Sequence, residues 1–126
     1  MTGPILPLID HVHLRTVHLD KAVAFYRAVF EALGRSSDIR SGRDWLELGS
    51  FYLDQADEGN VSSRVHLAFA ARSRAEVQAF YTAGLGAGGQ DNGPPRLRDY
   101  HPGYYAAYLF DPDGNNIEAK FDERGL

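Results

Sequence analysis

The sequence contains no cysteine, which excludes disulfide bonds, thiolate metal ligands and a cysteine nucleophile. Any bound metal ion would need His, Asp, Glu or Gln ligands. Basic residues are also few, because 13 Lys and Arg stand against 17 Asp and Glu, giving a formal net charge of -4 without a Lys/Arg cluster. This balance argues against nucleic acids as partners.

Long apolar runs are absent too. No stretch approaches the ~20 apolar residues that a membrane span requires. The first ten residues, MTGPILPLID, have neither the basic start nor the apolar run of a secretory signal. We therefore expect a cytoplasmic protein without a membrane partner. Its 126 residues, 44% of them hydrophobic, suit a single domain with a packed core.

The chain repeats itself with a shift of 55 residues. This shift aligns His11 with His66 and produces seven identities over positions 10–34, including a Phe-Tyr pair and a final glycine. Strand-like segments separated by turn signals follow each repeated unit. Each half therefore predicts a strand, a helix and then two or three antiparallel strands, with a polar linker at 55–63 between the halves.

Local signals place the predicted helices and loops. Asp20 is a plausible N-cap of the first helix, and Gly34 is a good C-terminal stop. The second helix opens with the capping box of Ser73 and Glu76. The segment 86–104 is rich in Gly, Pro and charged residues, so we expect a long loop with one short strand in it.

Alternation with period two assigns side chains to the faces of the predicted strands. In the run HVHLRTV, the apolar side chains turn one way and the face opposite carries His11 and His13. The same alternation in the first strand of the second half and in the last strand leaves His66 and Glu118 on the face away from the helices.

Two imidazoles and one carboxylate from three strands can bind a divalent ion and leave positions open for water or substrate. His11, His66 and Glu118 are such a set, and the repeat gives the two histidines equivalent positions. Histidines on the solvated face of a sheet are also ordinary surface residues, and Glu118 after a turn can be a solvated carboxylate. Residue patterns alone leave both interpretations open.

The segments DHVHLRTVHLDKAVAFY, VHLAFAA and, most specifically, HPGYYAAYLFDPDGNNIEAKF resemble the vicinal oxygen chelate superfamily, also called glyoxalase, bleomycin-resistance and dioxygenase proteins. The resemblance covers nearly the whole chain and is strongest to an uncharacterised glyoxalase-like subgroup. It implies an α+β fold of two tandem βαβββ modules, at about 8–56 and 64–122. These would form an open, cup-shaped mixed β-sheet with the helices outside.

The resemblance also implies a metal site and a partner. It carries over His11, His66 and Glu118 as ligands of a divalent ion, either Zn, Ni, Mn or Fe. Small members usually form homodimers, so it further implies a homodimer in which His11 reaches a site whose other ligands come from the second copy. Four-ligand members have another carboxylate in the first module; superposing Gly49 on Gly114 places Leu53 there, so we expect that ligand to be missing.

The remaining three-ligand pattern resembles extradiol dioxygenases and fosfomycin-modifying transferases. The latter reaction is not assigned, because His13 stands where those enzymes have a threonine and their serine- and glycine-rich potassium loop is absent. His13, on the same face as His11, can be a catalytic base, a substrate contact or a merely solvated residue. The other candidates for binding substrate are Arg15, Glu47, His101 and Tyr105.

Two functions follow from the resemblance. The first is a small metalloenzyme acting on an oxygen-bearing substrate, with isomerase, lyase, transferase or dioxygenase chemistry and with Glu118 and His13 as catalytic residues. The second is a metal-free protein that binds an antibiotic or another small molecule in the same cup. Retention of all three candidate ligands favours the enzyme, whereas the missing carboxylate and the many tyrosines favour the binding protein.

Overall fold

The computed structural model describes residues 8–57 and 64–125. The first module forms a four-stranded sheet in the order β1-β4-β3-β2, in which β1 is parallel to β4 and the other neighbours are antiparallel. A helix, α1, and a single 3-10 turn, η1, connect β1 to β2. The bounds are β1 Val12–Thr16, α1 Leu19–Ala32, η1 Ser36–Asp38, β2 Arg40–Ser41, β3 Trp45–Leu48 and β4 Phe51–Gln55.

The second module repeats this plan. Its sheet has the order β5-β8-β7-β6, again with one parallel pair, β5 and β8, at one edge. The bounds are β5 His66–Ala70, α2 Arg74–Gly86, β6 Gln90–Arg98, β7 Tyr104–Phe110 and β8 Asn116–Asp122. The α+β class with two βαβββ modules and open mixed sheets is thereby confirmed.

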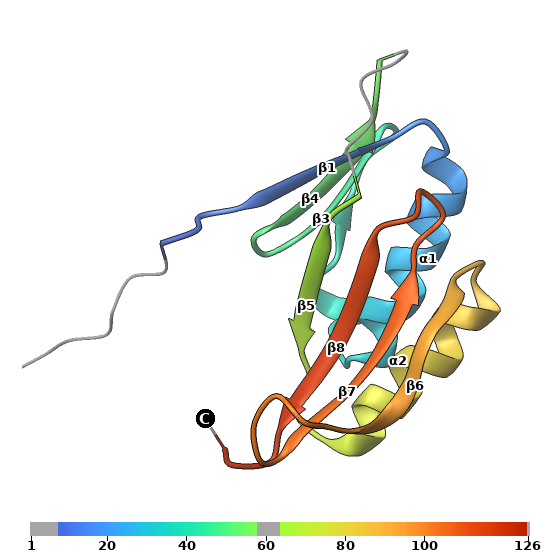
Figure 1. Ribbon diagram of the computed structural model, residues 1–126. Coiled ribbons are helices and arrows are strands. Elements are labelled where there is room, and N and C mark those ends of the chain that lie inside the picture. Colours follow the sequence, from blue (N-terminus) through green and yellow to red (C-terminus); the bar gives the residue numbers. More distant parts are fainter. Residues whose placement is uncertain (1–7, 58–63, 126) are drawn as a thin grey trace, which may run out of the picture.

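A single core joins the modules, and both helices lie on the same side of the two sheets (Figure 1). Aromatic rings connect the halves: Phe30 of α1 and Phe51 of β4 lie 5.2 and 5.8 Å, centroid to centroid, from Phe69 of β5. Phe30 and Phe51 are buried and Phe69 is partly buried, so the three rings contribute apolar contact between the modules. Within the described residues, no helix covers the opposite face of either sheet.

The helix ends agree only partly with the sequence signals. The first helix begins at Leu19 with His18 as its N-cap, so Asp20 lies inside the first turn and is not the cap. Gly34 follows the helix with a φ of 76°, a left-handed conformation that glycine adopts readily. Ser73 caps α2 as predicted, accepting a 3.0 Å hydrogen bond from the amide of Glu76. Neither helix in the described ranges is long and apolar enough to cross a membrane.

The expected loop at 86–104 is largely a strand. The nine residues of β6 pair antiparallel with β7, and the register shifts on both sides of Gly93. An edge strand has one side that needs no hydrogen bonds, so it tolerates Pro94 and Pro95 where a central strand would not. The glycine and prolines that suggested a loop are located at the bulges of an edge strand.

Candidate functional site

The predicted alternation of faces is correct in the strands that carry the candidate ligands. In β1, Leu14 and Thr16 are buried against the helices, and His13 and Arg15 extend to the open face. In β8, Ile117 and Ala119 are fully buried in the core. Glu118 lies between them and therefore points to the opposite side of the sheet.

His66 and Glu118 are in direct contact on the open face of the second sheet. Nε2 of His66 lies 2.7 Å from Oε1 of Glu118. The imidazole is half exposed, at 53%, whereas the carboxylate is only 1% exposed. The two residues come from the parallel pair β5 and β8, so the first residue of one strand meets the third residue of the other.

Two tyrosines of β7 cover the carboxylate. The hydroxyl of Tyr104 donates a hydrogen bond to Oε2 of Glu118, and Tyr108 stands directly opposite Glu118 in the ladder. Burial raises the pKa of Tyr104 to about 12, and its hydrogen bond to Glu118 acts in the same direction. Burial and then the negative charge of Glu118 raise the pKa of Tyr108 further still. Both hydroxyls are therefore protonated donors at neutral pH.

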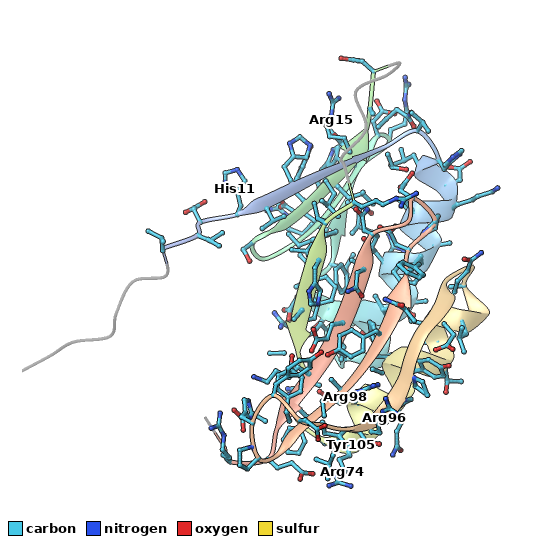
Figure 2. All side chains as sticks on the ribbon, viewed as in Figure 1. His11, Arg15, Arg74, Arg96, Arg98 and Tyr105 are labelled. Carbon is cyan, nitrogen blue, oxygen red and sulfur yellow. The ribbon has the colours of Figure 1, made fainter. Side chains whose placement is uncertain are left out.

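His11 lies apart from this pair. It precedes β1 on an exposed segment that runs away from the body of the molecule (Figure 2), and its Nδ1 is 2.8 Å from Oδ1 of Asp10. Within residues 8–57 and 64–125, no three His, Asp or Glu side chains come together as metal ligands. One chain thus brings together two of the three residues selected from the sequence.

The ladders identify the first-module counterpart of Glu118. In the second module Glu118 pairs with Ala68, and the 55-residue repeat aligns Ala68 with His13. His13 pairs with Tyr52, so Tyr52 is the counterpart. The assignment of Leu53 to that position is wrong by one residue, since Leu53 points into the core. No carboxylate occupies the position, as expected.

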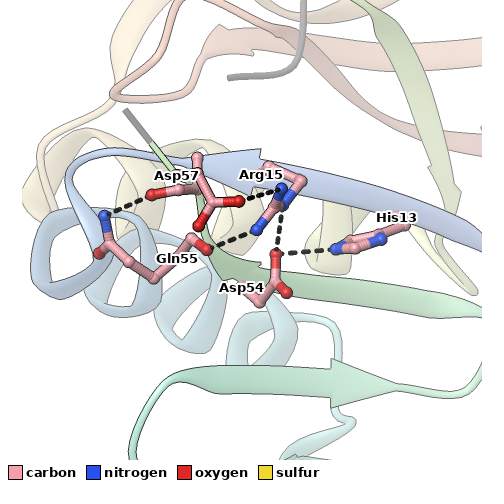
Figure 3. A network of polar contacts seen from close by, with 6 residues as sticks. His13, Arg15, Asp54, Gln55 and Asp57 are labelled. Atoms are coloured by element: carbon pink, nitrogen blue, oxygen red, sulfur yellow. Dashed lines mark hydrogen bonds and ion pairs between the residues drawn. The ribbon is translucent and has the colours of Figure 1, made fainter. Parts of the chain in front are cut away.

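A hydrogen-bonded network that includes His13, Arg15 and Asp54 lies on the same face (Figure 3). Nε2 of His13 is 2.8 Å from Oδ1 of Asp54, and Nε of Arg15 donates to the same oxygen at 3.1 Å. Arg15 also donates to the carbonyl of Gln55 at 2.9 Å. Burial raises the pKa of Asp54, but the bonds from His13 and Arg15 outweigh it and lower that pKa. The carboxylate therefore stays ionised and orients the imidazole.

Aromatic and charged side chains complete this face. The rings of Trp45 and Tyr52 stack 6.1 Å apart, and the ring of His13 meets Tyr52 edge-on at 5.0 Å. Glu47 pairs across the ladder with Tyr52, and its carboxylate is 3.2 Å from Nη1 of Arg40. A hollow of about 420 Å³ on this face is lined in part by His11, His13 and Glu47, so three residues selected from the sequence share one space.

Two further candidates lie elsewhere. Tyr105 faces the helices: it is 6% exposed, and its hydroxyl accepts a 3.1 Å bond from Gln78 of α2. Its expected place in the substrate pocket is therefore not supported by the geometry, and its neighbour Tyr104 points to the open face instead. His101 lies where β6 turns into β7, with Nε2 3.7 Å from Oδ2 of Asp122 and its ring 4.9 Å from Tyr104.

The set of candidate site residues does not include two cationic side chains on the second module's open face. Lys120 places Nζ 4.4 Å above the ring of Tyr104, and Arg98 lies 5.0 Å above the ring of Tyr108. Alternation in β8 places Lys120 on the same face as Glu118, two residues before it. Alternation gives no face for Arg98, because its segment was expected to be a loop and because a bulged strand does not follow a simple period of two.

The His66 and Glu118 pair fits part of a divalent metal site. Two ligands about 2.1 Å from one ion, at right angles to each other, are about 3 Å apart, close to the observed contact. Glu118 is a buried acceptor whose two hydrogen bonds use only part of its lone-pair capacity. A buried carboxylate requires a positive or hydrogen-bonding partner, and the donor set here, one imidazole and one carboxylate, is chemically suited to zinc, manganese, nickel or iron.

Comparisons with known proteins agree with this fold. Residues 8–119 match the Glyoxalase/Bleomycin resistance protein/Dioxygenase superfamily. The metallothiol transferase FosB of Shouchella clausii (strain KSM-K16) is 34% identical over 116 residues, which are 87% of this chain and 77% of that protein. A glyoxalase/bleomycin resistance protein from Albidiferax ferrireducens T118 superposes with a TM-score of 0.74 at 29% identity, over 91% of this chain and 98% of that one.

A more distant structure shares the fold. The fosfomycin resistance protein FosX from Mesorhizobium loti has a TM-score of 0.64 at 17% identity, with 93% of each chain covered.

Proposed function

The chain belongs to the Glyoxalase/Bleomycin resistance protein/Dioxygenase superfamily, and from this premise we propose that it is a divalent-metal-dependent enzyme acting on a small oxygen-bearing substrate. The observation that carries the proposal is the contact of His66 with the nearly fully buried Glu118. The contact lies on an open sheet face, where a substrate has access. Burying a carboxylate beside an imidazole is costly unless a cation or a well-made hydrogen bond compensates it.

His11 of a second copy is the proposed third ligand. His11 is exposed, at 65%, on a segment that extends away from its own chain, so it is available to another molecule. The repeat gives it the position that His66 holds in the second module. In this proposal a homodimer contains two equivalent sites, each with His66 and Glu118 of one chain and His11 of the other.

The bound ion would polarise substrate oxygens and stabilise negative charge that develops on them. The side chains of the first module would then surround the substrate. His13 is the proposed catalytic residue, held by Asp54 in one orientation through the 2.8 Å contact. Arg15 and Glu47 on the same face are proposed to contact polar groups of the substrate, whereas Trp45 and Tyr52 provide a flat apolar surface.

Several reactions use such a site, among them isomerisation, lyase chemistry, group transfer and dioxygenation. The similarity to a metallothiol transferase favours the transfer of a thiol as the first reaction to assay. A suitable assay incubates the metal-loaded protein with a small thiol and a panel of oxygen-bearing electrophiles, and follows the loss of free thiol. Metal-dependent consumption that His13→Gln reduces at least tenfold supports the assignment, and consumption independent of metal and of His13 contradicts it.

The metal site can be tested by a binding measurement that needs no substrate. Protein purified without chelators is titrated with Mn²⁺, Ni²⁺, Zn²⁺ and Fe²⁺, the last under anaerobic conditions, and binding is measured by calorimetry. Wild type should bind at least one ion, and His11→Ala, His66→Ala and Glu118→Ala should each weaken that binding tenfold or more. His18→Ala is the matched control, because His18 is exposed at the start of α1. If all variants bind like wild type, the proposed site is wrong.

A metal-free binding protein is the second candidate. It is favoured by the His66 and Glu118 contact itself, which forms a complete hydrogen bond without an ion, and by Tyr52 in the position of a fourth carboxylate. In that case the stacked rings of Trp45 and Tyr52 would bind an aromatic ligand. Tight binding of a planar ligand by protein that binds no divalent ion, lost in Trp45→Ala, would identify this function.

A further inference from the structure

Glu118 is held at both of its oxygens by different residues. His66 contacts Oε1 from β5, and the hydroxyl of Tyr104 donates to Oε2 from β7. We propose that Tyr104 is a positioning residue which fixes Oε2, so that Glu118 presents Oε1 alone to the ion. This inference rests on the proposed function and adds to it the coordination mode of the carboxylate and the residue that determines it.

The position of Tyr104 is itself well determined. Its ring is in contact with the ring of His101 at 4.9 Å and that of Tyr100 at 5.0 Å, both edge-on, and Nζ of Lys120 lies 4.4 Å above it. Each contact restricts a different movement of the ring. The hydroxyl is thus directed at Glu118 by its surroundings and does not depend on an ion to place it.

Because Glu118 is buried, water cannot replace the hydrogen bond from Tyr104. At 1% exposure the carboxylate has no access to bulk water, so an oxygen that loses its donor remains without a partner or rotates toward another positive group. Near an ion, the free Oε2 would turn toward it, and Oε1 would lose the orientation in which the hydrogen bond of Tyr104 holds it. Groups that orient a metal ligand in this way typically contribute about 10- to 100-fold to metal affinity.

The adjacent residue offers a matched control. Tyr105 has the same side chain on the same strand, but it points to the other face and its hydroxyl contacts Gln78 of α2. Removing either hydroxyl with Phe preserves the ring and deletes one hydrogen bond. Only Tyr104→Phe should remove a hydrogen bond from Glu118. Both substitutions remove a tyrosine hydroxyl from β7, so they share any general effect of that loss on stability.

The test is calorimetric titration of the full chain with Mn²⁺, for wild type, Tyr104→Phe and Tyr105→Phe. We expect the dissociation constant of Tyr104→Phe to rise about 10- to 100-fold and that of Tyr105→Phe to stay within about twofold. Thermal unfolding of the metal-free proteins confirms that both variants are folded. In the Co²⁺ complexes, Tyr104→Phe should also weaken the visible absorption, because binding through both carboxylate oxygens raises the coordination number.

The outcomes separate this inference from the proposed function. If wild type binds no divalent ion, both fail. If wild type binds and Tyr104→Phe has the same affinity and the same Co²⁺ spectrum, the positioning role fails and the metal site remains. Equal losses in the two variants would also reject it, since a hydroxyl on the far face would then matter as much as the one on Glu118.

Discussion

At the scale of single residues, Asp54 connects two side chains of the first module's open face. Its Oδ1 accepts from Nε of Arg15 at 3.1 Å and lies 2.8 Å from Nε2 of His13, and its side chain is 24% exposed. Because Arg15 is anchored to the main chain at Gln55, the carboxylate has a fixed position. The orientation of His13 therefore depends on Asp54.

This network predicts a pH-dependent contribution to stability. The pKa of Asp54 is lower in the folded state than its ordinary value, so the folded protein binds this proton less readily than the unfolded chain. The contribution is complete above the ordinary pKa of about 4 and is lost as the pH falls through the lowered folded value. Asp54→Asn should lower the free energy of unfolding by about 1 kcal/mol at pH 7, and by less at pH 3.

Urea unfolding at both pH values checks this. Asp44→Asn is the control, because it makes the same charge change at an exposed carboxylate 3.7 Å from Arg43. An effect of Asp54→Asn that is the same at pH 3 and pH 7 would show that the carboxylate charge is not responsible.

Residue positions were predictable where a strand alternates without interruption. His13, His66 and Glu118 lie on the predicted face because their strands follow a period of two. The counterpart of Glu118 was misassigned because two turn glycines, Gly49 and Gly114, were taken as equivalent. The ladders show that the turns differ by one residue, which moves the position from Leu53 to Tyr52.

At the scale of elements, the turn between β7 and β8 determines how the His66 and Glu118 pair is held. Asp111 is buried at this turn and accepts a 2.5 Å hydrogen bond from the hydroxyl of Tyr26 on α1. Nδ2 of Asn115 donates to the same carboxylate at 2.8 Å, and Oδ1 of Asn115 accepts from the amide of Val65 at 3.0 Å. The turn thus links α1, β5 and β8 immediately before the two candidate ligands.

We expect Asn115→Ala to lower the free energy of unfolding by about 2 kcal/mol, because it leaves the main-chain amide of Val65 without a partner and removes one of the hydrogen bonds to the buried carboxylate of Asp111. The amide of Val65 should also exchange its hydrogen faster. Asn116→Ala is the control, since its side chain makes only an exposed 3.1 Å contact with Asn92 and should change stability by less than about 0.5 kcal/mol. Urea unfolding and hydrogen exchange provide the measurements, and equal effects of both substitutions would contradict the role given to Asn115.

Element types were predictable from local signals, with one exception. The helices, the cap at Ser73 and the stop at Gly34 follow from side-chain chemistry close in sequence. Strand β6 was missed because Gly93 and two prolines are compatible with a strand only at a sheet edge. Whether a segment lies at an edge depends on the order of strands, which is a tertiary property and has no local signal.

At the scale of the whole molecule, His11 lies apart from His66 and Glu118, the other two candidate ligands. The repeat makes His11 and His66 equivalent within their modules. It is compatible with a site between the two modules of one chain and with a site between modules of two chains. In this chain the modules are joined through their helices and the rings of Phe30, Phe51 and Phe69. The segment that carries His11 extends away from β5 and β8 (Figure 1).

A site shared between two copies predicts that two variants which each bind metal poorly regain metal binding when they are mixed. His11→Ala and His66→Ala should each bind divalent ions poorly alone. When the two are unfolded together and refolded as a mixture, half of the dimers are mixed, and one of the two sites in each mixed dimer has all three ligands. About a quarter of the wild-type metal sites should therefore return. Calorimetry with Mn²⁺ counts these sites, and light scattering verifies the dimer.

A mixture of His66→Ala with Glu118→Ala is the control. In each of its dimers, both chains lack one member of their own His66 and Glu118 pair, so every site stays incomplete. No recovery in the first mixture, or a monomer at micromolar concentration, would mean that His11 does not complete a site on a second copy.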